Sequence, residues 1–340
     1  LNNNEWHHIA VSVDASDGSV FYLDGREIGT DASIAWIGSV NDVDAIHIGS
    51  FQGSGGFSAD ASGLIDDLRY YDRALSGADI SELIVATSDL VVDTNSDAID
   101  GDTSSIGALL ANTGSDGQIS LREAITAANG TSGLDAIRFE IPLNHTIQVG
   151  SDATASGIRL PSITDAVFID GTTDSEFIST PIIEISGTSA GGSDGLTFAI
   201  GSSGSSVRGL VINNFADEAI DIDIGVDEVY VFGNYIGTNV AGSSTAGFGN
   251  GENGIVVYGD NNVIGGTSAA DRNVISGNGL AGIFLQFGAS GNQVIGNYIG
   301  VDALGVTDLG NADDGITIEG SGNYIGGTAA GAGNVISGND

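Results

Sequence analysis

The sequence repeats itself from about residue 207 to its last residue, and this repeat constrains the fold more than any other feature. The hexapeptide NVISGN at 273–278 returns at 334–339, which is 61 residues later. The segment DGITI at 314–318 follows NGIVV at 253–257 by the same interval of 61 residues. So regular an interval indicates one structural unit used repeatedly, with each copy packing against its neighbours.

Each long period contains short apolar segments of three kinds, which recur in a fixed order. The first kind is marked by Val211, Tyr235, Val274, Tyr298 and Val335, the second by Ile220, Ile255, Ile283 and Ile316, and the third by Val229, Val263, Val294 and Tyr324. Three kinds of strand, each stacked on its own kind about 4.8 Å apart, predict a triangular coil with inward-facing Ile and Val. The sequence therefore predicts a right-handed parallel β-helix, whose longer coils carry extra loops at 237–252 and 300–313.

Asn and Gly recur between these segments, where each corner of a coil bends the chain sharply. Left-handed backbone conformations suit Gly first and Asn next. Asn side chains at equivalent corners can also stack into amide ladders. We expect this structural role for five asparagines: Asn213, Asn234, Asn278, Asn297 and Asn339.

Composition excludes several classes of function. The chain has 8 Lys and Arg residues against 45 Asp and Glu residues, a net charge of −37, and neither Cys nor Met. So acidic a surface repels nucleic-acid phosphates and anionic headgroups, and without Cys there is no disulfide or thiolate chemistry. The absence of an apolar run of about 20 residues argues against membrane insertion.

Residues 1–86 have an all-β pattern, with alternating apolar residues in WHHIAVSV at 6–13 and a turn signal at Asp24-Gly25. Together with YLDG at 22–25 and GLIDDLRYYDRALS at 63–76, these motifs resemble laminin-G-like, concanavalin A-like jelly rolls. They match the C-terminal half of that family's pattern, so we expect a partial β-sandwich. The resemblance implies glycans or proteins as partners, and other copies of this protein are expected as partners in self-assembly.

Residues 87–130 are predicted to form an acidic linker followed by a helix that caps the β-helix of 131–340. Ser120 and Glu123 have the spacing of a capping box, and the helix is expected to end at Asn129-Gly130. The segment ISLREAITAAN at 119–129 resembles the SLREA element of bacterial surface proteins, in which parallel β-helix repeats follow it. This resemblance implies a secreted or cell-surface bacterial protein.

The linker also contains a run of oxygen ligands at alternate positions, as in a calcium loop. We predict a calcium site formed by Asp93, Asn95, Asp97, Asp100 and Asp102. The run departs from an EF-hand, because Ala98 replaces the glycine at position 6 and Ser104 the glutamate at position 12. The alternative hypothesis is a solvated acidic linker.

An enzyme is the second hypothesis for the β-helix, since carboxylates on an outer face can act as paired acid and base. The candidate carboxylates are Asp217, Asp221, Asp223, Asp313 and Asp314. The repeat region contains no His or Lys, and its arginines, Arg208 and Arg272, each precede a first-kind strand, which indicates a structural role. A solvated acidic face explains the carboxylates better, so no catalytic residue is assigned.

The sequence thus predicts an all-β, non-catalytic, secreted or cell-surface protein with a structural or adhesive role. Its β-helix is expected to be a rigid stalk that carries a lectin-like module and self-assembles into larger fibres. The alternative is an extracellular polysaccharide-acting enzyme, either a hydrolase or a lyase, built on the β-helix.

Overall fold

The computed structural model describes residues 88–152 and 159–340 and, before them, five strands. The chain divides into two compact units, Leu1–Ile84 and Val85–Asp340. All five early strands belong to the first unit and pair antiparallel, as the all-β prediction requires. They are β1 (Ile9–Asp14), β2 (Gly18–Leu23) and β3 (Arg26–Asp31) in one sheet, and β4 (Ser50–Gln52) with β5 (Ser58–Asp60) in another. The motif at 63–76 and the turn at 24–25 lie outside the described residues.

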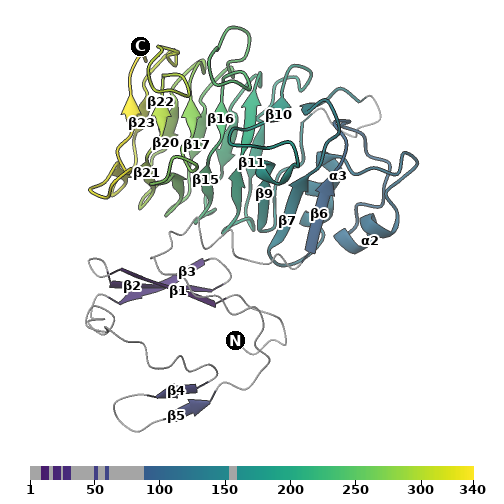
Figure 1. The fold of residues 1–340 in the computed structure, drawn as a ribbon, viewed down its shortest axis with the longest axis horizontal. Coiled ribbons are helices and arrows are strands. Elements are labelled where there is room, and N and C mark those ends of the chain that lie inside the picture. Colours follow the sequence, from purple (N-terminus) through teal and green to yellow (C-terminus); the bar gives the residue numbers. More distant parts are fainter. Residues whose placement is uncertain are drawn as a thin grey trace. The chain divides into compact units, whose positions relative to one another are not determined.

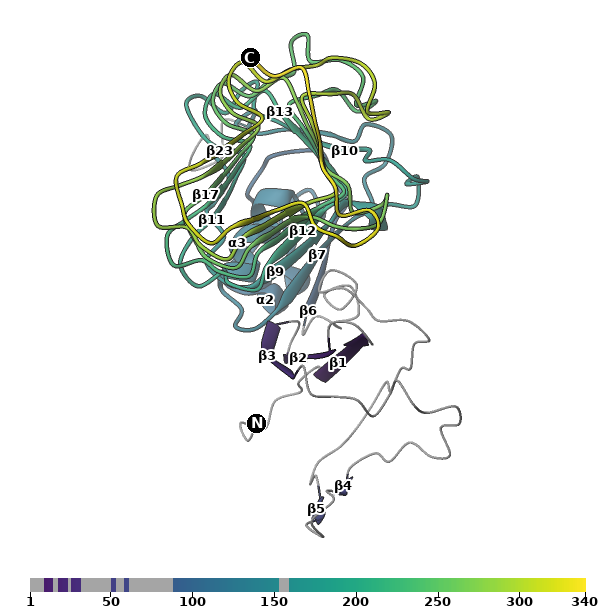
Figure 2. The ribbon, with the colours of Figure 1, turned by 90° about the vertical axis from the view of Figure 1, so that its left-hand side faces the viewer.

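The second unit is a parallel β-helix built from three sheets that surround one interior (Figures 1 and 2). We name each sheet by one of its middle strands. The β13 sheet contains β8 (Thr146–Gln148), β10 (Ile183–Ser186), β13 (Leu210–Asn213), β16 (Tyr235–Ile236), β19 (Val274–Ile275), β22 (Tyr298–Ile299) and β25 (Val335–Ile336). The β14 sheet contains β11 (Leu196–Phe198), β14 (Ile220–Ile222), β17 (Ile255–Val257), β20 (Ile283–Leu285) and β23 (Ile316–Ile318). The β15 sheet contains β6 (Ser88–Val92), β7 (Asp135–Phe139), β9 (Val167–Asp170), β12 (Ser206–Arg208), β15 (Tyr230–Phe232), β18 (Val263–Gly265), β21 (Gln293–Ile295) and β24 (Tyr324–Ile325).

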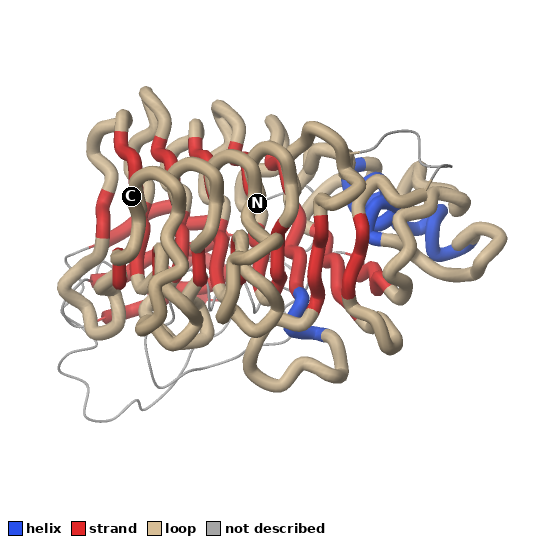
Figure 3. The backbone as a smooth tube through the Cα atoms, turned by 90° about the horizontal axis from the view of Figure 1, so that it is seen from above, coloured by secondary structure: helices blue, strands red, loops and turns tan. Residues whose placement is uncertain are grey.

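The second-kind isoleucines stack as the repeat predicts. Ile220 pairs with Ile255, Ile255 with Ile283, and Ile283 with Ile316, all in parallel register. The first three are fully buried in the continuous core. Each such side chain contributes about 1.5–3 kcal/mol through burial, so this column is a main source of the stability of the coils. In Figure 3 the strands of successive coils lie in parallel rows.

The first-kind residues mark the correct strands but lie on the outer face of the β13 sheet. Val211, Tyr235 and Val274 form a small separate cluster, against which Tyr298 and Ala303 pack. The inward positions are instead filled by their neighbours Ile212, Ile236, Ile275 and Ile299. Ala303 belongs to the predicted loop 300–313, and its N–H bonds to Gly242 of the other predicted loop, 237–252, at 2.8 Å. The extra loops therefore cover apolar outer positions of this sheet.

The third-kind alignment is only partly correct. Val263 pairs with Tyr230 and not with Val229, and Val294 pairs with Ile264. Since a shift of one residue moves a side chain to the opposite face, the third-kind residues belong to two different rows. The true inward row is Val231, Ile264, Val294 and Ile325. The corners before this sheet differ in length from coil to coil, and that hides the register in the sequence.

The predicted linker 87–130 is part of the β-helix unit. Its strand β6 pairs in parallel with β7 over five residues, at the end of the β15 sheet. Two helices follow, α2 (Ile106–Ala111) and α3 (Leu121–Asn129). The capping box of Ser120 and Glu123 is confirmed, and α3 contacts β6 and β7. Its buried residues Leu121, Ala124 and Ile125 join the continuous core, so α3 closes this end of the interior.

Asparagine ladders run along three corners of the β-helix. Within a ladder, the side-chain amide of one Asn donates to Oδ1 of the Asn one coil further on, as in Asn273 Nδ2 to Asn297 Oδ1 at 2.9 Å. The ladders are Asn234–Asn273–Asn297–Asn334, Asn250–Asn278–Asn311–Asn339 and Asn262–Asn292–Asn323. Four of the five predicted asparagines belong to them. The exception is Asn213, which lies in β13 and donates to Glu184 Oε1 at 2.7 Å.

We predict that Asn273→Ala destabilises the β-helix by about 2–4 kcal/mol, because several buried polar groups lose their hydrogen-bond partners. The Asn234 N–H loses its acceptor at 2.9 Å, and the Val231 carbonyl oxygen loses its donor at 2.8 Å. Urea denaturation followed by circular dichroism measures the loss. Gln293→Ala, at an exposed strand position, is the control and should change stability by less than about 0.5 kcal/mol. Equal effects of the two substitutions would contradict a stabilising role for the ladder.

Candidate functional site

The residues predicted to bind calcium do not converge on one point. Asp97 is fully buried and forms a bidentate ion pair with Arg122 of α3, with Nε–Oδ1 and Nη2–Oδ2 distances of 2.9 and 2.7 Å. The same carboxylate accepts a bond from the Gly150 N–H at 2.6 Å, and Arg122 also donates to the Arg159 carbonyl oxygen. Asp97 therefore joins the capping helix to the following coil.

The other carboxylates of this set accept hydrogen bonds from backbone N–H groups. Asp93 accepts from the Ile119 N–H at 2.7 Å. Hydrogen bonds from Ser115 lower the pKa of Asp100, and bonds from Ser104 lower that of Asp102. Within 88–152 and 159–340, no group of three or more His, Asp or Glu side chains is arranged to hold a metal ion. Calcium binding at 93–102 stays a prediction, and this segment is not the freely solvated linker of the alternative hypothesis.

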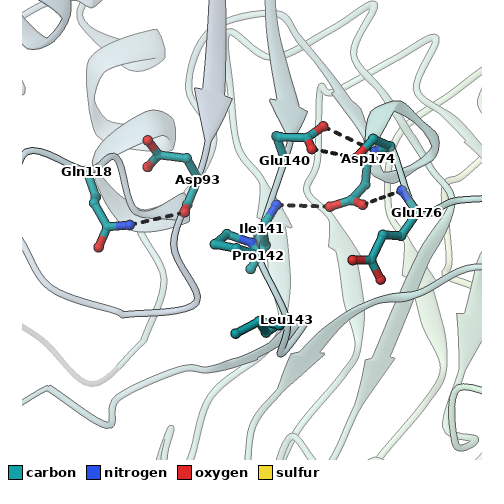
Figure 4. Close-up of a pocket in the computed structure, with 9 residues that line it drawn as sticks. Asp93, Gln118, Glu140, Ile141, Pro142, Leu143, Asp174 and Glu176 are labelled. Atoms are coloured by element: carbon teal, nitrogen blue, oxygen red, sulfur yellow. Dashed lines mark hydrogen bonds between the residues drawn. The ribbon is translucent and has the colours of Figure 1, made fainter.

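A cleft of about 470 Å³ lies beside this segment (Figure 4). Its lining includes Asp93, Glu140, Asp174 and Glu176, together with the apolar residues Ile141, Pro142 and Leu143. Asp174 accepts from the Ile141 N–H at 2.9 Å, and Glu140 accepts from the Ser175 hydroxyl at 2.5 Å. These two carboxylates thus tie one coil to the next.

One histidine approaches the acidic side of this cleft. His145 Nε2 lies 3.5 Å from Asp174 Oδ1 and 3.9 Å from Glu176 Oε2. Asp174 already accepts two backbone hydrogen bonds, from Ile141 and Glu176, at 2.9 Å each. The arrangement suits an anchored turn better than a pair of groups that exchange protons with a substrate.

A second acidic group lies on the outer face of the β14 sheet, where the sequence predicts outward carboxylates. Asp221 and Asp223 alternate with the fully buried Ile220 and Ile222, so their predicted orientation is confirmed. The structure adds Asp194, Glu218 and Glu252, which interact electrostatically with this pair or with each other. We call these five carboxylates the acidic face. Asp194 and Glu218 each lie two residues before a strand, β11 and β14 respectively. The strand pattern of the sequence does not predict which way side chains at this position point.

Burial makes two members of the acidic face weak acids. Desolvation, together with the charges of Asp194 and Glu252, raises the pKa of Glu218 to about 8. Desolvation, with the charges of Asp194 and Asp223, raises the pKa of Asp221 to about 7. Both groups therefore titrate near neutral pH, as general acids of glycan hydrolases do.

The geometry of the acidic face differs from that of a glycan hydrolase. Glu218 and Asp194 hydrogen-bond directly to each other, whereas hydrolytic carboxylate pairs lie about 5–9.5 Å apart to admit a sugar and water. Of the other sequence candidates, Asp313 is exposed, and Asp314 is exposed and accepts from Thr317 at 3.1 Å. Neither contributes to the pKa shifts of Glu218 and Asp221.

The two arginines of the repeat region lie elsewhere and have structural contacts, as the sequence predicts. Arg208 pairs with Asp170 through two bonds of 2.9 Å and lies over the rings of Phe168 and Phe232. Arg272 lies 4.1 Å from the ring centre of Tyr298 and donates to the Gly296 carbonyl oxygen. Both stabilise neighbouring coils, and neither is placed to bind substrate beside the acidic face.

We predict that Asp97→Asn lowers the free energy of unfolding by about 3–5 kcal/mol, because Arg122 remains buried without its counter-charge. The loss should be the same in calcium chloride and in EGTA, as measured by urea denaturation. Asp102→Asn, at an exposed position of the same set, is the matched control and should have little effect. A wild-type stability that falls in EGTA, with no such fall in Asp97→Asn, would instead assign calcium to Asp97.

The acidic face predicts that stability falls as pH rises. Folding raises the pKa of Glu218 from 4.5 to about 8, so the folded state binds more protons than the unfolded state between these values. The stabilising contribution is therefore complete below about pH 4.5 and lost as pH rises through about 8. Glu218→Gln should flatten the dependence of the urea midpoint on pH in this range. Asp313→Asn, which removes an exposed carboxylate, should leave the slope unchanged.

Comparison with known proteins shows what the first unit is similar to. Residues 1–81 match the model of the Concanavalin A-like lectin/glucanases superfamily. No curated protein matches the sequence. A solved structure of an S-layer domain-containing protein (residues 221–444) from Clostridium thermocellum matches with 26% identity and a TM-score of 0.20, over 24% of this chain and 41% of that chain. No described helix is long and apolar enough to cross a membrane. The chain thus joins a region similar to concanavalin A-like lectins and glucanases to a three-sheet parallel β-helix.

Proposed function

We propose that this protein is a non-catalytic structural and adhesive protein of the bacterial cell surface or exterior. Its β-helix is a rigid stalk, and the lectin-like region at 1–81 is the module that binds glycans. The proposal combines the family of the first unit with the construction of the second.

The observation that carries the stalk role is the unbroken register of the β-helix from β7 to β25. From β11 onward, each coil continues the hydrogen bonding of the previous one in all three sheets, and the ladders satisfy buried polar groups at three corners. Such a structure transmits load along its axis because the buried side chains of the described coils form one continuous core.

A glycan hydrolase is the second candidate, and the raised pKa values of Glu218 and Asp221 favour it. The direct Asp194–Glu218 hydrogen bond opposes it, because a pair in contact leaves no room for a glycosidic bond. The adhesive role therefore has better support than the enzymatic one.

The test uses the full chain on an array of immobilised glycans and, in parallel, on neutral polysaccharides in solution. We expect retention on at least one glycan, no release of reducing ends, and unchanged retention for Glu218→Gln. Limited proteolysis should yield a resistant fragment close to Val85–Asp340 that the same glycan does not retain. Release of reducing ends by the wild type, lost in Glu218→Gln, would replace the adhesive role with an enzymatic one.

A further inference from the structure

Large apolar side chains are exposed along one corner of the β-helix, next to the acidic face. Ile200, Ile224 and Phe287 occupy the second position after β11, β14 and β20, and they are 72%, 69% and 86% exposed. Backbone hydrogen bonds continue the register of the sheet through this corner, from Asp223 N to Phe198 O and from Gln286 N to Val257 O. Ile200 and Ile224 lie on adjacent coils, about 4.8 Å apart, and Phe287 lies two coils beyond Ile224 along the same corner. We call them the apolar row.

The corner positions between and beyond these residues are glycines that cannot be replaced without a clash. A Cβ at Gly259 would lie 1.8 Å from the Val226 carbonyl oxygen, and one at Gly320 would lie 2.0 Å from that of Ala289. Large apolar residues thus occupy the second position of the seven-residue corners after β11, β14 and β20, and glycine occupies that of the five-residue corners after β17 and β23. Since exposed Ile and Phe add nothing to folding, this pattern favours a contact surface.

The acidic face borders the apolar row directly, because Asp223 and Ile224 are consecutive residues at the end of β14. Asp221 lies in the middle of the face, and its Oδ1 atom is buried yet accepts no hydrogen bond from any described residue. A buried acceptor without a donor costs about 1–3 kcal/mol, and a positive charge beside the carboxylate lowers that cost. Within the described residues, Asp221 Oδ1 is therefore an acceptor of the acidic face that has no hydrogen-bond donor.

We propose that the acidic face and the apolar row together form a docking surface for a basic, apolar segment of another protein. Lys or Arg side chains of the segment contact Asp221, Asp223 and Glu218, and its aliphatic side chains cover Ile200, Ile224 and Phe287. The inference adds a partner to the stalk and does not depend on glycan binding by the first unit.

Charge selects this occupant over a second copy of the chain. The chain carries a net charge of −37, so two copies repel each other across an acidic surface. The electrostatic partners that raise the pKa values of this face are Asp194, Asp223 and Glu252, all of them acidic, and Tyr258 also faces it. A cationic segment relieves this repulsion, and the apolar row supplies affinity that salt does not screen.

Proton release distinguishes docking on this face from general attraction to an acidic protein. In the free protein near neutral pH, Glu218 and Asp221 are largely or partly protonated, because their pKa values are about 8 and about 7. A cation beside them favours the ionised forms, so binding expels protons and strengthens as pH rises toward 8. Ordinary exposed carboxylates are already ionised at pH 7 and expel none.

The experiment titrates a synthetic peptide of alternating Lys and Leu into the full chain by calorimetry, at about 0.15 M salt. Parallel titrations in buffers of different ionisation enthalpy measure the protons released. We expect saturable binding with proton release near pH 7. The double substitution Ile224→Ser with Phe287→Ser should weaken binding at least tenfold, and Asp221→Asn with Glu218→Gln should abolish the proton release.

Matched variants away from the surface separate specific docking from non-specific attraction. Leu304→Ser with Val306→Ser removes equally exposed apolar side chains from another loop, and Asp313→Asn with Asp314→Asn removes two exposed charges. Each control should change the affinity less than twofold. Absence of saturable binding, binding without proton release, equal losses in the controls, or retention of a neutral oligosaccharide on this face in place of the peptide would each overturn the proposal.

Discussion

The continuous parallel register of the coils is the constraint on which the rest of the structure depends. Every coil must place apolar side chains at the same three inward rows and must satisfy the polar backbone at the same corners. The Ile255–Ile283–Ile316 column meets the first requirement, and the ladder through Asn273 meets the second. A coil that failed at either would break the hydrogen bonding of both neighbours, because each strand pairs on two sides. The narrow choice of Ile, Val, Asn and Gly follows from this repetition.

The sequence predicts the inward rows where the repeat is strong and loses them where the corners vary. Three of the four second-kind isoleucines directly follow a glycine, and all four lie in one row. The third-kind residues follow corners of unequal length, so counting along the chain misplaced Val229 and Val263 by one residue relative to each other. Strand β6 was missed for another reason. Its pairing partner β7 is more than forty residues away in the sequence, beyond two helices, and carries none of the repeat motifs.

The site predictions show a similar division between local and non-local information. Alternation with Ile220 and Ile222 places Asp221 and Asp223 outward, and this is correct. The role of Asp97 could not be predicted, because it depends on Arg122, 25 residues later, and on the Gly150 N–H, 53 residues later. Oxygen-bearing residues at alternate positions of a sequence define the spacing of possible ligands but not the direction in which their side chains point. Whether they converge on an ion or turn to separate backbone donors depends on contacts that form only when the coils close.

The carboxylates of the acidic face reduce the stability of the fold, and their position on the outer side of the β14 sheet explains how the protein tolerates them. Asp221 pairs in register with Thr197 on one side and Val256 on the other, so a half-buried carboxylate occupies a row otherwise suited to neutral side chains. The inward neighbours Ile220 and Ile222 are fully buried and hold β14 in place whatever the charge on its outer face. Inward and outward rows of a parallel β-helix are therefore independent: one is fixed by stacking, and the other is free to carry groups that cost stability. Residues that reduce stability on such a free row, beside exposed apolar side chains, are better explained by a contact made outside the chain than by the needs of folding.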